Sequence, residues 1–159
     1  MGVIITNAQI VFTDLPISIS ENNAYPTNFK TGKRYKSKDL GKFASQMAQW
    51  RLLNAQAFPE VHRIMDGWVA IGFHVLVGFR RDRVYTKLGM PKKIDASNYV
   101  KIIQDGVSNA IDRDDCHFWR STGEKAPLKL GDERERCTVI LTEAPQKDLA
   151  GWHSDLQIV

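Results

Sequence analysis

Residues 95–115 read DASNYVKIIQDGVSNAIDRDD, and this stretch decides how the chain folds. Apolar residues recur in it every three or four positions, which predicts a helix over about residues 97–111 with one buried side. The residues expected on that buried side are Val100, Ile103, Val107, Ala110 and Ile111.

The other side of this helix is polar and lies between two acidic ends. Asn98, Lys101 and Asp105 follow one another at spacings of three and four residues, so they share one face. Asp95 comes just before the helix, and an acidic pair at 114–115 comes just after it. A helix of about fifteen residues is roughly 22 Å long, so these acids meet only if the chain folds back along it.

The segment before this helix predicts two strands and another helix. Residues 3–12 are apolar and β-branched and predict a strand, and a long polar loop is expected over 13–36. A helix capped by Ser37 should follow and end before Pro59. Residues 68–79 alternate and predict a strand. Its inner face is expected to hold Val69, Ile71, Phe73, Val75 and Val77.

Two strands are expected after the central helix, at residues 116–120 and 137–144, with a polar connection between them. An antiparallel hairpin is one way for them to pair, and Trp119 is expected in the core. The predicted fold is therefore α+β. It has a small mixed β-sheet packed with two main helices, in the order β-α-β-α-β-β.

Length and composition fit one soluble globular domain over residues 1–159, with a core at about 3–144 and a loosely ordered tail at 145–159. The chain shows neither a signal peptide nor a run of about 20 apolar residues, so we expect a cytoplasmic protein with no membrane partner. Cys116 and Cys137 lack the spacing of a zinc site and are expected to be reduced thiols.

Positive charge gathers in two stretches, residues 28–42 and 79–93. Together they hold twelve basic and two acidic residues, a net charge of +10, so the rest of the chain carries −6 of the total of +4. This segregation is typical of a surface for a polyanion, although two solvated basic loops are an equal alternative. The cations expected to contact a phosphate backbone are Lys30, Lys33, Arg34, Lys36, Lys38, Arg80, Arg81, Arg83, Lys92 and Lys93.

Acids near cations are the groups that metal-dependent phosphodiester cleavage requires. A metal must neutralise charge on the phosphate, activate a water and stabilise the leaving oxygen, and Mg²⁺ prefers carboxylate ligands for this role. Residues 95–115 hold such carboxylates and Lys101. Spacing alone also allows an acidic turn and a solvated lysine, so both interpretations stay open at this point.

The order of these residues resembles the RusA family of Holliday-junction resolvases. The pattern D-x-[DS]-N-x-x-K-x-x-x-D, followed by an Asp-Asp pair, is read here from Asp95 to Asp115. Residues 15–37, which read LPISISENNAYPTNFKTGKRYKS, are similar to the family's proline-asparagine-tyrosine loop. CTVILTEA at 137–144 resembles its last strand, so the resemblance covers roughly residues 5–144.

This resemblance implies a small nuclease that acts as a symmetric homodimer in a bacterial or phage-infected cell. Such enzymes cut four-way DNA junctions at paired positions, using Mg²⁺ or Mn²⁺. By position, Asp95 and Asp115 match metal-binding catalytic aspartates, Lys101 matches the essential helix lysine, and Asp114 matches the neighbouring acid. For the dimer contact, the residues Ile71, Val75 and Leu76 or the first helix are candidates.

One position departs from the family pattern. Ser97 stands where many members carry a second aspartate, and a hydroxyl is a weaker metal ligand than a carboxylate. Ser97 is also a candidate helix cap. With Asn98 and Asp105 it forms an auxiliary set, in which Asp105 or Asp114 is placed to supply the missing charge.

Three other functions stay open beside a junction resolvase. One is a branched-DNA endonuclease without four-way preference, and another is a catalytically weakened DNA-binding protein, which Ser97 keeps open. The third, an RNA-binding module, ranks low because no aromatic RNP-type motif is present. Tyr25, Phe29 and Tyr35 lie in the basic loop, where they either stack on unpaired bases or anchor the loop to the core.

Overall fold

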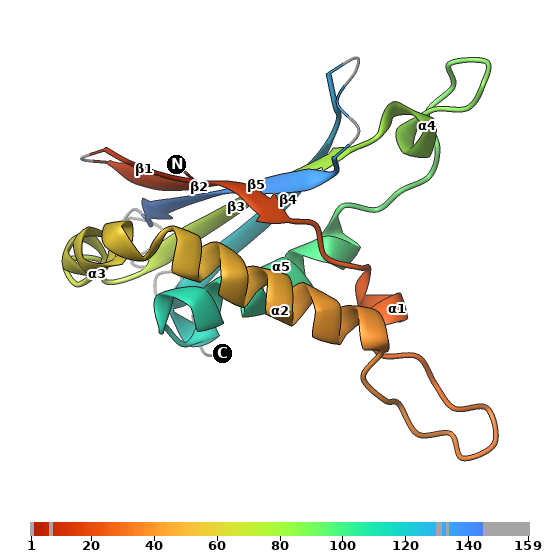
Figure 1. The fold of residues 1–159 in the computed structure, drawn as a ribbon, viewed down its shortest axis with the longest axis horizontal. Helices are drawn as coiled ribbons and strands as arrows, with labels where there is room; N and C mark the ends of the chain where they lie inside the picture. The colour runs from red at the N-terminus through yellow and green to blue at the C-terminus, as the bar shows by residue number, and fades with distance from the viewer. Residues whose placement is uncertain (1, 7, 130–131, 133, 145–159) are drawn as a thin grey trace, which may run out of the picture.

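Five strands form one mixed sheet in the computed structural model, which describes residues 2–6, 8–129, 132 and 134–144. The order across the sheet is β1-β2-β5-β3-β4 (Figure 1). β3 and β4 pair in parallel, and every other neighbouring pair is antiparallel. The strands are β1 (Val3–Ile5), β2 (Gln9–Pro16), β3 (Ile71–Phe79), β4 (Phe118–Pro127) and β5 (Arg136–Glu143).

Helices α2, α3 and α5 cover one face of this sheet (Figure 1). Short helices and turns occupy the connections between the long elements. The helices are α1 (Glu21–Ala24), α2 (Lys38–Leu53), α3 (Phe58–Met65), α4 (Arg81–Val84) and α5 (Ser97–Ile111), with single 3₁₀ turns at η1 (Ala55–Ala57) and η2 (Asp115–His117). No helix among the described residues is both long and apolar enough to span a membrane.

The core lies between the sheet and these helices. Trp50 of α2 packs edge-on against Phe12 of β2 and Phe58 of α3, with ring centroids 5.5 and 6.2 Å apart. Its indole N–H also donates a hydrogen bond to the carbonyl oxygen of Thr13, 3.0 Å away. Burial of this apolar surface supplies most of the free energy that holds α2 on the sheet.

Several predictions from the sequence are confirmed. The α+β class and the mixed sheet are as expected, and α5 has the bounds predicted for the central helix. Ile103, Val107 and Ile111 of its predicted buried side are fully buried. Ser37 is the N-cap of α2, where its hydroxyl oxygen accepts a hydrogen bond from the backbone N–H of Leu40 at 3.2 Å.

The N-terminal predictions were partly wrong. Residues 3–12 form two paired strands, because Thr6 bonds to Gln9 and turns the chain, and β2 then continues to Pro16. α1 interrupts the loop that was expected over 13–36. α2 ends before Pro59 as predicted, and Pro59 also lies in the first turn of α3, where a proline needs no hydrogen-bond donor.

The expected hairpin of the last two strands is wrong. β5 lies between β2 and β3, and β4 lies at the edge, parallel to β3. α5 connects β3 to β4, and a helical crossover favours parallel pairing. The polar residues 121–127 therefore belong to an edge strand with mostly exposed side chains, which is why Trp119 is 60% exposed instead of lying in the core.

Predictions for the middle strand segment are corrected at Val69 and at the residues suggested for a dimer contact. Val69 is exposed because β3 begins only at Ile71. Ile71 and Val75 face the core, so they are not free for a dimer contact, whereas Leu76 lies half-buried on the opposite face of the sheet. The predicted tail at 145–159 lies outside the described residues.

Candidate functional site

β4 runs back along α5, and this arrangement folds the chain over its central helix. Ser121 donates a hydrogen bond to the side-chain oxygen of Gln104 at 3.0 Å. A Cβ atom at Gly123 would lie 2.4 Å from a methyl group of Val100, so only glycine allows this close approach. Further along, Lys125 reaches the segment just before the helix. The acidic pair that starts this return is thereby held beside α5.

Lys101 lies between two carboxylates at the centre of the site. Its ammonium nitrogen is 2.9 Å from an oxygen of Asp105 and 2.5 Å from an oxygen of Asp115. The hydrogen bonds that Lys101 donates to Asp105 and to Asp115 raise its pKa, in that order of size, which keeps the ammonium charged. All three side chains remain about half exposed. The fold thus brings Asp115 to Lys101 and Asp105, and we name these three residues the lysine–carboxylate cluster.

Asp95 is held separately at the start of α5. One of its oxygens accepts hydrogen bonds from the hydroxyl of Ser97 at 2.7 Å and from the backbone N–H of Ser97 at 2.9 Å. These two bonds, with a smaller contribution from the charge of Lys125, hold the pKa of Asp95 below its ordinary value. Among the described residues, no hydrogen bond or ion pair joins Asp95 to the lysine–carboxylate cluster.

Ser97 has a different local role from the one expected. It is the first residue of α5, the cap position is taken by Ala96, and the side chain that accepts the first free N–H belongs to Asp95. The hydroxyl of Ser97 is directed at the carboxylate of Asp95 and therefore steadies a predicted metal ligand. Asn98 lies half-buried in the next position of the helix.

Asp114 caps the 3₁₀ turn η2. Its carboxylate accepts a hydrogen bond from the backbone N–H of Cys116 at 2.9 Å, and this bond holds the pKa of Asp114 below its ordinary value. The same carboxylate raises the pKa of the exposed Cys116 thiol. Asp114 is exposed and directly precedes Asp115.

Carboxylates are the ligands that a hard cation prefers, and the described residues offer few of them close together. Within the described ranges, no three carboxylate, imidazole or thiol side chains stand close enough together to hold a metal ion. Asp105 and Asp115 each contact the ammonium of Lys101, which is itself the cationic group between them. Mg²⁺ is commonly held by one or two carboxylates and retained waters, so these exposed carboxylates suit it.

A groove of about 570 Å³ between α2 and α5 leads to Asp105, Asp114 and Asp115. Its floor is partly apolar, with Phe43 and Met47 from α2. Cations and acids stand along its rim, among them Lys36, Arg51, Arg113, Asp105, Asp114 and Asp115. The acids are therefore reachable from solvent along a surface that also presents positive charge.

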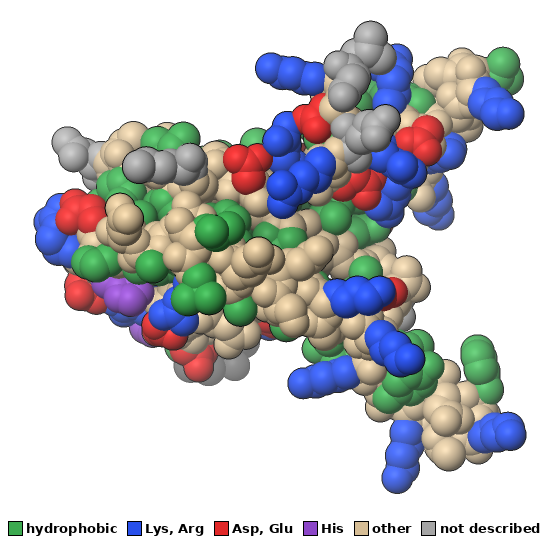
Figure 2. All heavy atoms as spheres, in the orientation of Figure 1, with side chains coloured by type: hydrophobic (Ala, Val, Ile, Leu, Met, Phe, Trp, Pro, Cys, Tyr) green, Lys and Arg blue, Asp and Glu red, His purple; other side chains and the backbone are tan. Residues whose placement is uncertain are grey.

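Most of the predicted phosphate-binding cations stand on two projections. Hairpin A comprises residues 26–35, closed by a bridge between Thr27 and Arg34, and hairpin B comprises residues 80–92, closed by a bridge between Tyr85 and Pro91. Both project from the same end of the molecule in Figure 1, and Figure 2 shows Lys and Arg side chains along both. The exposed predicted cations are Lys30, Lys33, Arg34, Lys36, Lys38, Arg80, Arg81, Lys92 and Lys93.

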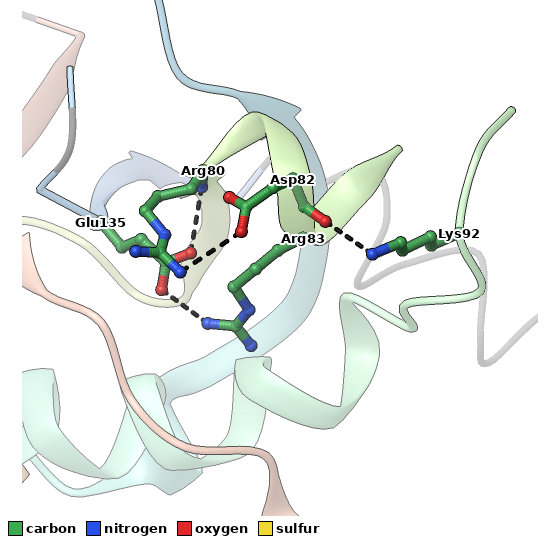
Figure 3. Close-up of polar contacts among 5 residues, drawn as sticks. All are labelled: Arg80, Asp82, Arg83, Lys92 and Glu135. Atoms are coloured by element: carbon green, nitrogen blue, oxygen red, sulfur yellow. Dashed lines mark hydrogen bonds and ion pairs between the residues drawn. The ribbon is translucent and has the colours of Figure 1, made fainter. Parts of the chain in front are cut away.

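Arg83 differs from these cations because it is already paired (Figure 3). Its guanidinium donates to Glu135 at 2.5 Å and to the hydroxyl of Tyr99 at 3.2 Å. Glu135, whose side chain is only 15% exposed, also accepts the backbone N–H of Arg80 at 3.0 Å. Lys92 donates to the carbonyl oxygen of Asp82 at 2.6 Å and closes the base of hairpin B. Arg83 thus anchors this hairpin.

We expect Glu135→Gln to loosen hairpin B without unfolding the domain. The change removes the charge that pairs with Arg83, and a hydrogen bond to a charged group contributes about 1.5 kcal/mol or more. Local opening should therefore become roughly tenfold more frequent, and trypsin should cut after Lys87 about tenfold faster. Glu143→Gln, an exposed change at the end of β5, is the control. Equal cutting rates in the two variants would show that Glu135 does not anchor the hairpin.

Lys125 is the residue that sequence reasoning missed. Its ammonium donates to the carbonyl oxygens of Ile94 at 2.8 Å and Lys92 at 3.3 Å, so it fastens the segment that carries Asp95 to β4. The stretch around Lys125 reads as a polar connection, and only the strand pairing brings it to Asp95.

Comparison with known proteins adds no assignment. No protein-family model and no curated protein matches the chain. The geometry of the lysine–carboxylate cluster, the two hairpins and the groove is therefore the basis of the functional conclusion.

Proposed function

We propose that this chain is a Mg²⁺-dependent endonuclease of the RusA type that cleaves branched DNA, with four-way junctions as the preferred substrate. The observation that carries the proposal is the exposed lysine–carboxylate cluster on α5, in which Lys101 contacts both Asp105 and Asp115. Nine exposed cations on or beside the two hairpins supply the charge that a DNA backbone requires. The order of the motif residues, from Asp95 to Asp115, agrees with this function.

We propose that Asp95 and Asp115, with help from Asp114, would hold the metal; the described residues do not bring three such side chains together, so the ion would have to draw Asp95 towards the lysine–carboxylate cluster. When bound, Mg²⁺ lowers the pKa of a coordinated water and neutralises charge on the phosphate; Mn²⁺ can take its place. Asp105 adds a fourth carboxylate, from α5 itself, which would offset the neutral Ser97. Ser97 orients the carboxylate of Asp95 through its hydroxyl.

Lys101 would hold a phosphate oxygen of the substrate. Its pKa lies above the ordinary value, so the side chain stays protonated over the whole neutral range. In the free protein Asp105 and Asp115 neutralise this ammonium. A substrate phosphate offers the same kind of contact, and Lys101 acts there as a point charge.

Two copies of the chain would act together on a junction. A four-way junction has two-fold symmetry, and a C₂ dimer matches it. The half-buried Leu76 lies on the face of the sheet opposite the core and is a candidate for the contact, together with the outer side of α2. The compartment we propose is the cytoplasm of a bacterial or phage-infected cell, as in the family that the sequence resembles.

Cleavage of synthetic substrates tests this proposal. Four-way, Y-shaped and linear DNA are incubated with Mg²⁺, with Mn²⁺ or with EDTA, and the products are resolved on a denaturing gel. We expect paired cuts in the four-way junction that require the metal. Cleavage of Y-shaped and four-way DNA at equal rates would favour a general branched-DNA endonuclease. Binding without cleavage, in Mg²⁺ and in Mn²⁺ alike, would favour a DNA-binding protein whose catalytic activity is weakened by Ser97.

Binding to the junction should weaken steeply as salt rises. If about six of the exposed cations contact phosphates, raising the salt from about 50 to 200 mM should lower the binding constant on the order of 10³-fold. Fluorescence anisotropy of a labelled junction in Ca²⁺ measures this slope without cleavage. A salt-independent binding constant would show that the two hairpins are not the DNA surface.

A further inference from the structure

Each basic hairpin ends in a large apolar side chain that no other described residue covers. Phe29 at the tip of hairpin A is 101% exposed, and Leu88 at the tip of hairpin B is 91% exposed. Figure 2 shows a hydrophobic side chain near the outer end of each projection, beside Lys or Arg side chains. A single exposed apolar residue is common, but the same arrangement at two tips on one end of the molecule calls for a physical reason.

Phe29 is displayed by an ordered turn. The backbone N–H of Asn28 donates to the carbonyl oxygen of Lys33 at 2.8 Å, and the side chain of Asn28 accepts from the N–H of Lys30 at 2.9 Å. Gly32 has a φ of 68°, a conformation that suits glycine and lets the chain return. The ring of Phe29 therefore projects from a hydrogen-bonded loop.

Leu88 is displayed in a similar way. The N–H of Gly89 donates to the carbonyl oxygen of Thr86 at 2.9 Å, and the N–H of Thr86 donates to the carbonyl oxygen of Met90 at 2.8 Å. Gly89 has a φ of 77°, as a tight hairpin requires. The base of this hairpin is fixed by Arg83 and Glu135, as Figure 3 shows. Both tips are thus supported from below.

Tyr25, which directly precedes hairpin A, has different surroundings from Phe29. Tyr25 packs against the core, and the guanidinium of Arg34 lies 5.8 Å from the centre of its ring. Arg34 also donates to the carbonyl oxygen of Tyr25 at 3.0 Å. Tyr25 therefore anchors the hairpin, Tyr35 at its base is about half exposed, and Phe29 at the tip is the fully exposed aromatic group.

The charges near Phe29 and Leu88 indicate which kind of ligand the hairpin tips contact. Lys30 follows Phe29 directly, Lys33 lies in the same turn, and Lys87 precedes Leu88, so each apolar group has exposed ammonium groups near it in the chain. Cations contact phosphates, which lie outside the bases in DNA, and an apolar group that projects beyond them can reach a base. Apolar side chains that enter a base step unstack it at a cost of a few kcal/mol, and bases that are already unpaired need less.

We propose that Phe29 and Leu88 are base-contacting wedges, each of which packs against an unstacked base near the branch point of the DNA. This inference rests on the DNA substrate of the proposed function and names the side chains that select a branched substrate over a linear duplex. A linear duplex resists unstacking, whereas a branch point offers bases that have lost a stacking neighbour.

The test uses four-way junctions with 2-aminopurine, which fluoresces when unstacked, either at the branch point or about eight base pairs away. Ca²⁺ replaces Mg²⁺ so that no strand is cut, and anisotropy of a second label measures binding. We expect the wild-type chain to raise the fluorescence at least threefold at the branch point and to leave the distant position unchanged.

Variants then assign this signal to the tips. Phe29→Ala and Leu88→Ala should each lose at least half of the increase while changing the binding constant less than fivefold, because the lysines remain. Phe29→Trp should keep the signal. Leu52→Ala is the matched control, since Leu52 is 76% exposed on α2 and outside both hairpins. All of these positions are exposed, so the variants should fold like the wild type.

The outcomes separate the two proposals. Tight binding to the junction with no fluorescence change at the branch point would overturn the wedge proposal. Equal fluorescence changes in wild type and in both alanine variants would overturn it as well. In both cases the proposal that the chain acts on branched DNA would stand. No binding to any junction would overturn the proposed function and the wedges with it. Binding to phosphatidylserine vesicles that Phe29→Ala abolishes, with the junction signal unaffected, would assign the tips to a membrane surface and overturn the wedges.

Discussion

Replacing Asp115 by asparagine is expected to lower the rate of Mg²⁺-dependent cleavage on the order of 10³-fold, which corresponds to about 4 kcal/mol of transition-state stabilisation. Asp115 is the carboxylate that both contacts Lys101 and belongs to the acidic pair assigned to the metal. The amide keeps the size of the side chain and removes its charge. Metal binding and the position of Lys101 should both suffer, while the fold should persist because the side chain is about half exposed.

Asp112→Asn is the matched control for this change. Asp112 lies three residues earlier, pairs with Arg51 and ends α5 with a φ of 52°, a conformation that asparagine adopts as readily as aspartate. An exposed ion pair of this kind contributes about 0–1 kcal/mol. Single-turnover cleavage of a labelled four-way junction over a range of Mg²⁺ concentrations measures both variants. Unchanged cleavage by Asp115→Asn, with the wild-type Mg²⁺ dependence, would remove Asp115 from the proposed site.

Phe12→Ala is expected to lower the free energy of unfolding by about 3–5 kcal/mol. The ring of Phe12 is fully buried in the layer between β2 and α2, where it meets Trp50 edge-on. Removal of the ring leaves a cavity, and Trp50, which holds α2 to the sheet, loses an aromatic contact. A loss of this size is a large part of the 5–15 kcal/mol by which a domain is usually stable.

Urea denaturation followed by tryptophan fluorescence measures this loss, and a melting temperature lower by on the order of 10 °C should accompany it. Phe29→Ala removes the same side chain from a fully exposed position and is the control, with an expected change within about 0.5 kcal/mol. A loss below about 1 kcal/mol for Phe12→Ala would mean that the contact between β2 and α2 is not part of the stable core.

The two phenylalanines also show how far burial can be predicted from sequence. Phe12 stands in an alternating apolar run, and such a run indicates a strand with one buried face. Phe29 stands among lysines, where the sequence leaves base stacking and core anchoring equally open. The structure distinguishes them because Tyr25, four residues earlier, takes the anchoring position. Trp119 was expected in the core and lies on an exposed edge strand, since its burial depended on the strand order.

Helix α5, the cap at Ser37 and the shared face of Lys101 and Asp105 were determined by the sequence alone. Their physical causes act within a few residues: helical periodicity, a side chain that satisfies a free N–H, and neighbours one turn apart. The approach of Asp115 to Lys101 and of Lys125 to the segment before Asp95 was decided only by the tertiary structure. Both depend on β4 pairing in parallel with β3 and returning along α5, and strand pairing is a long-range choice that local periodicity does not specify.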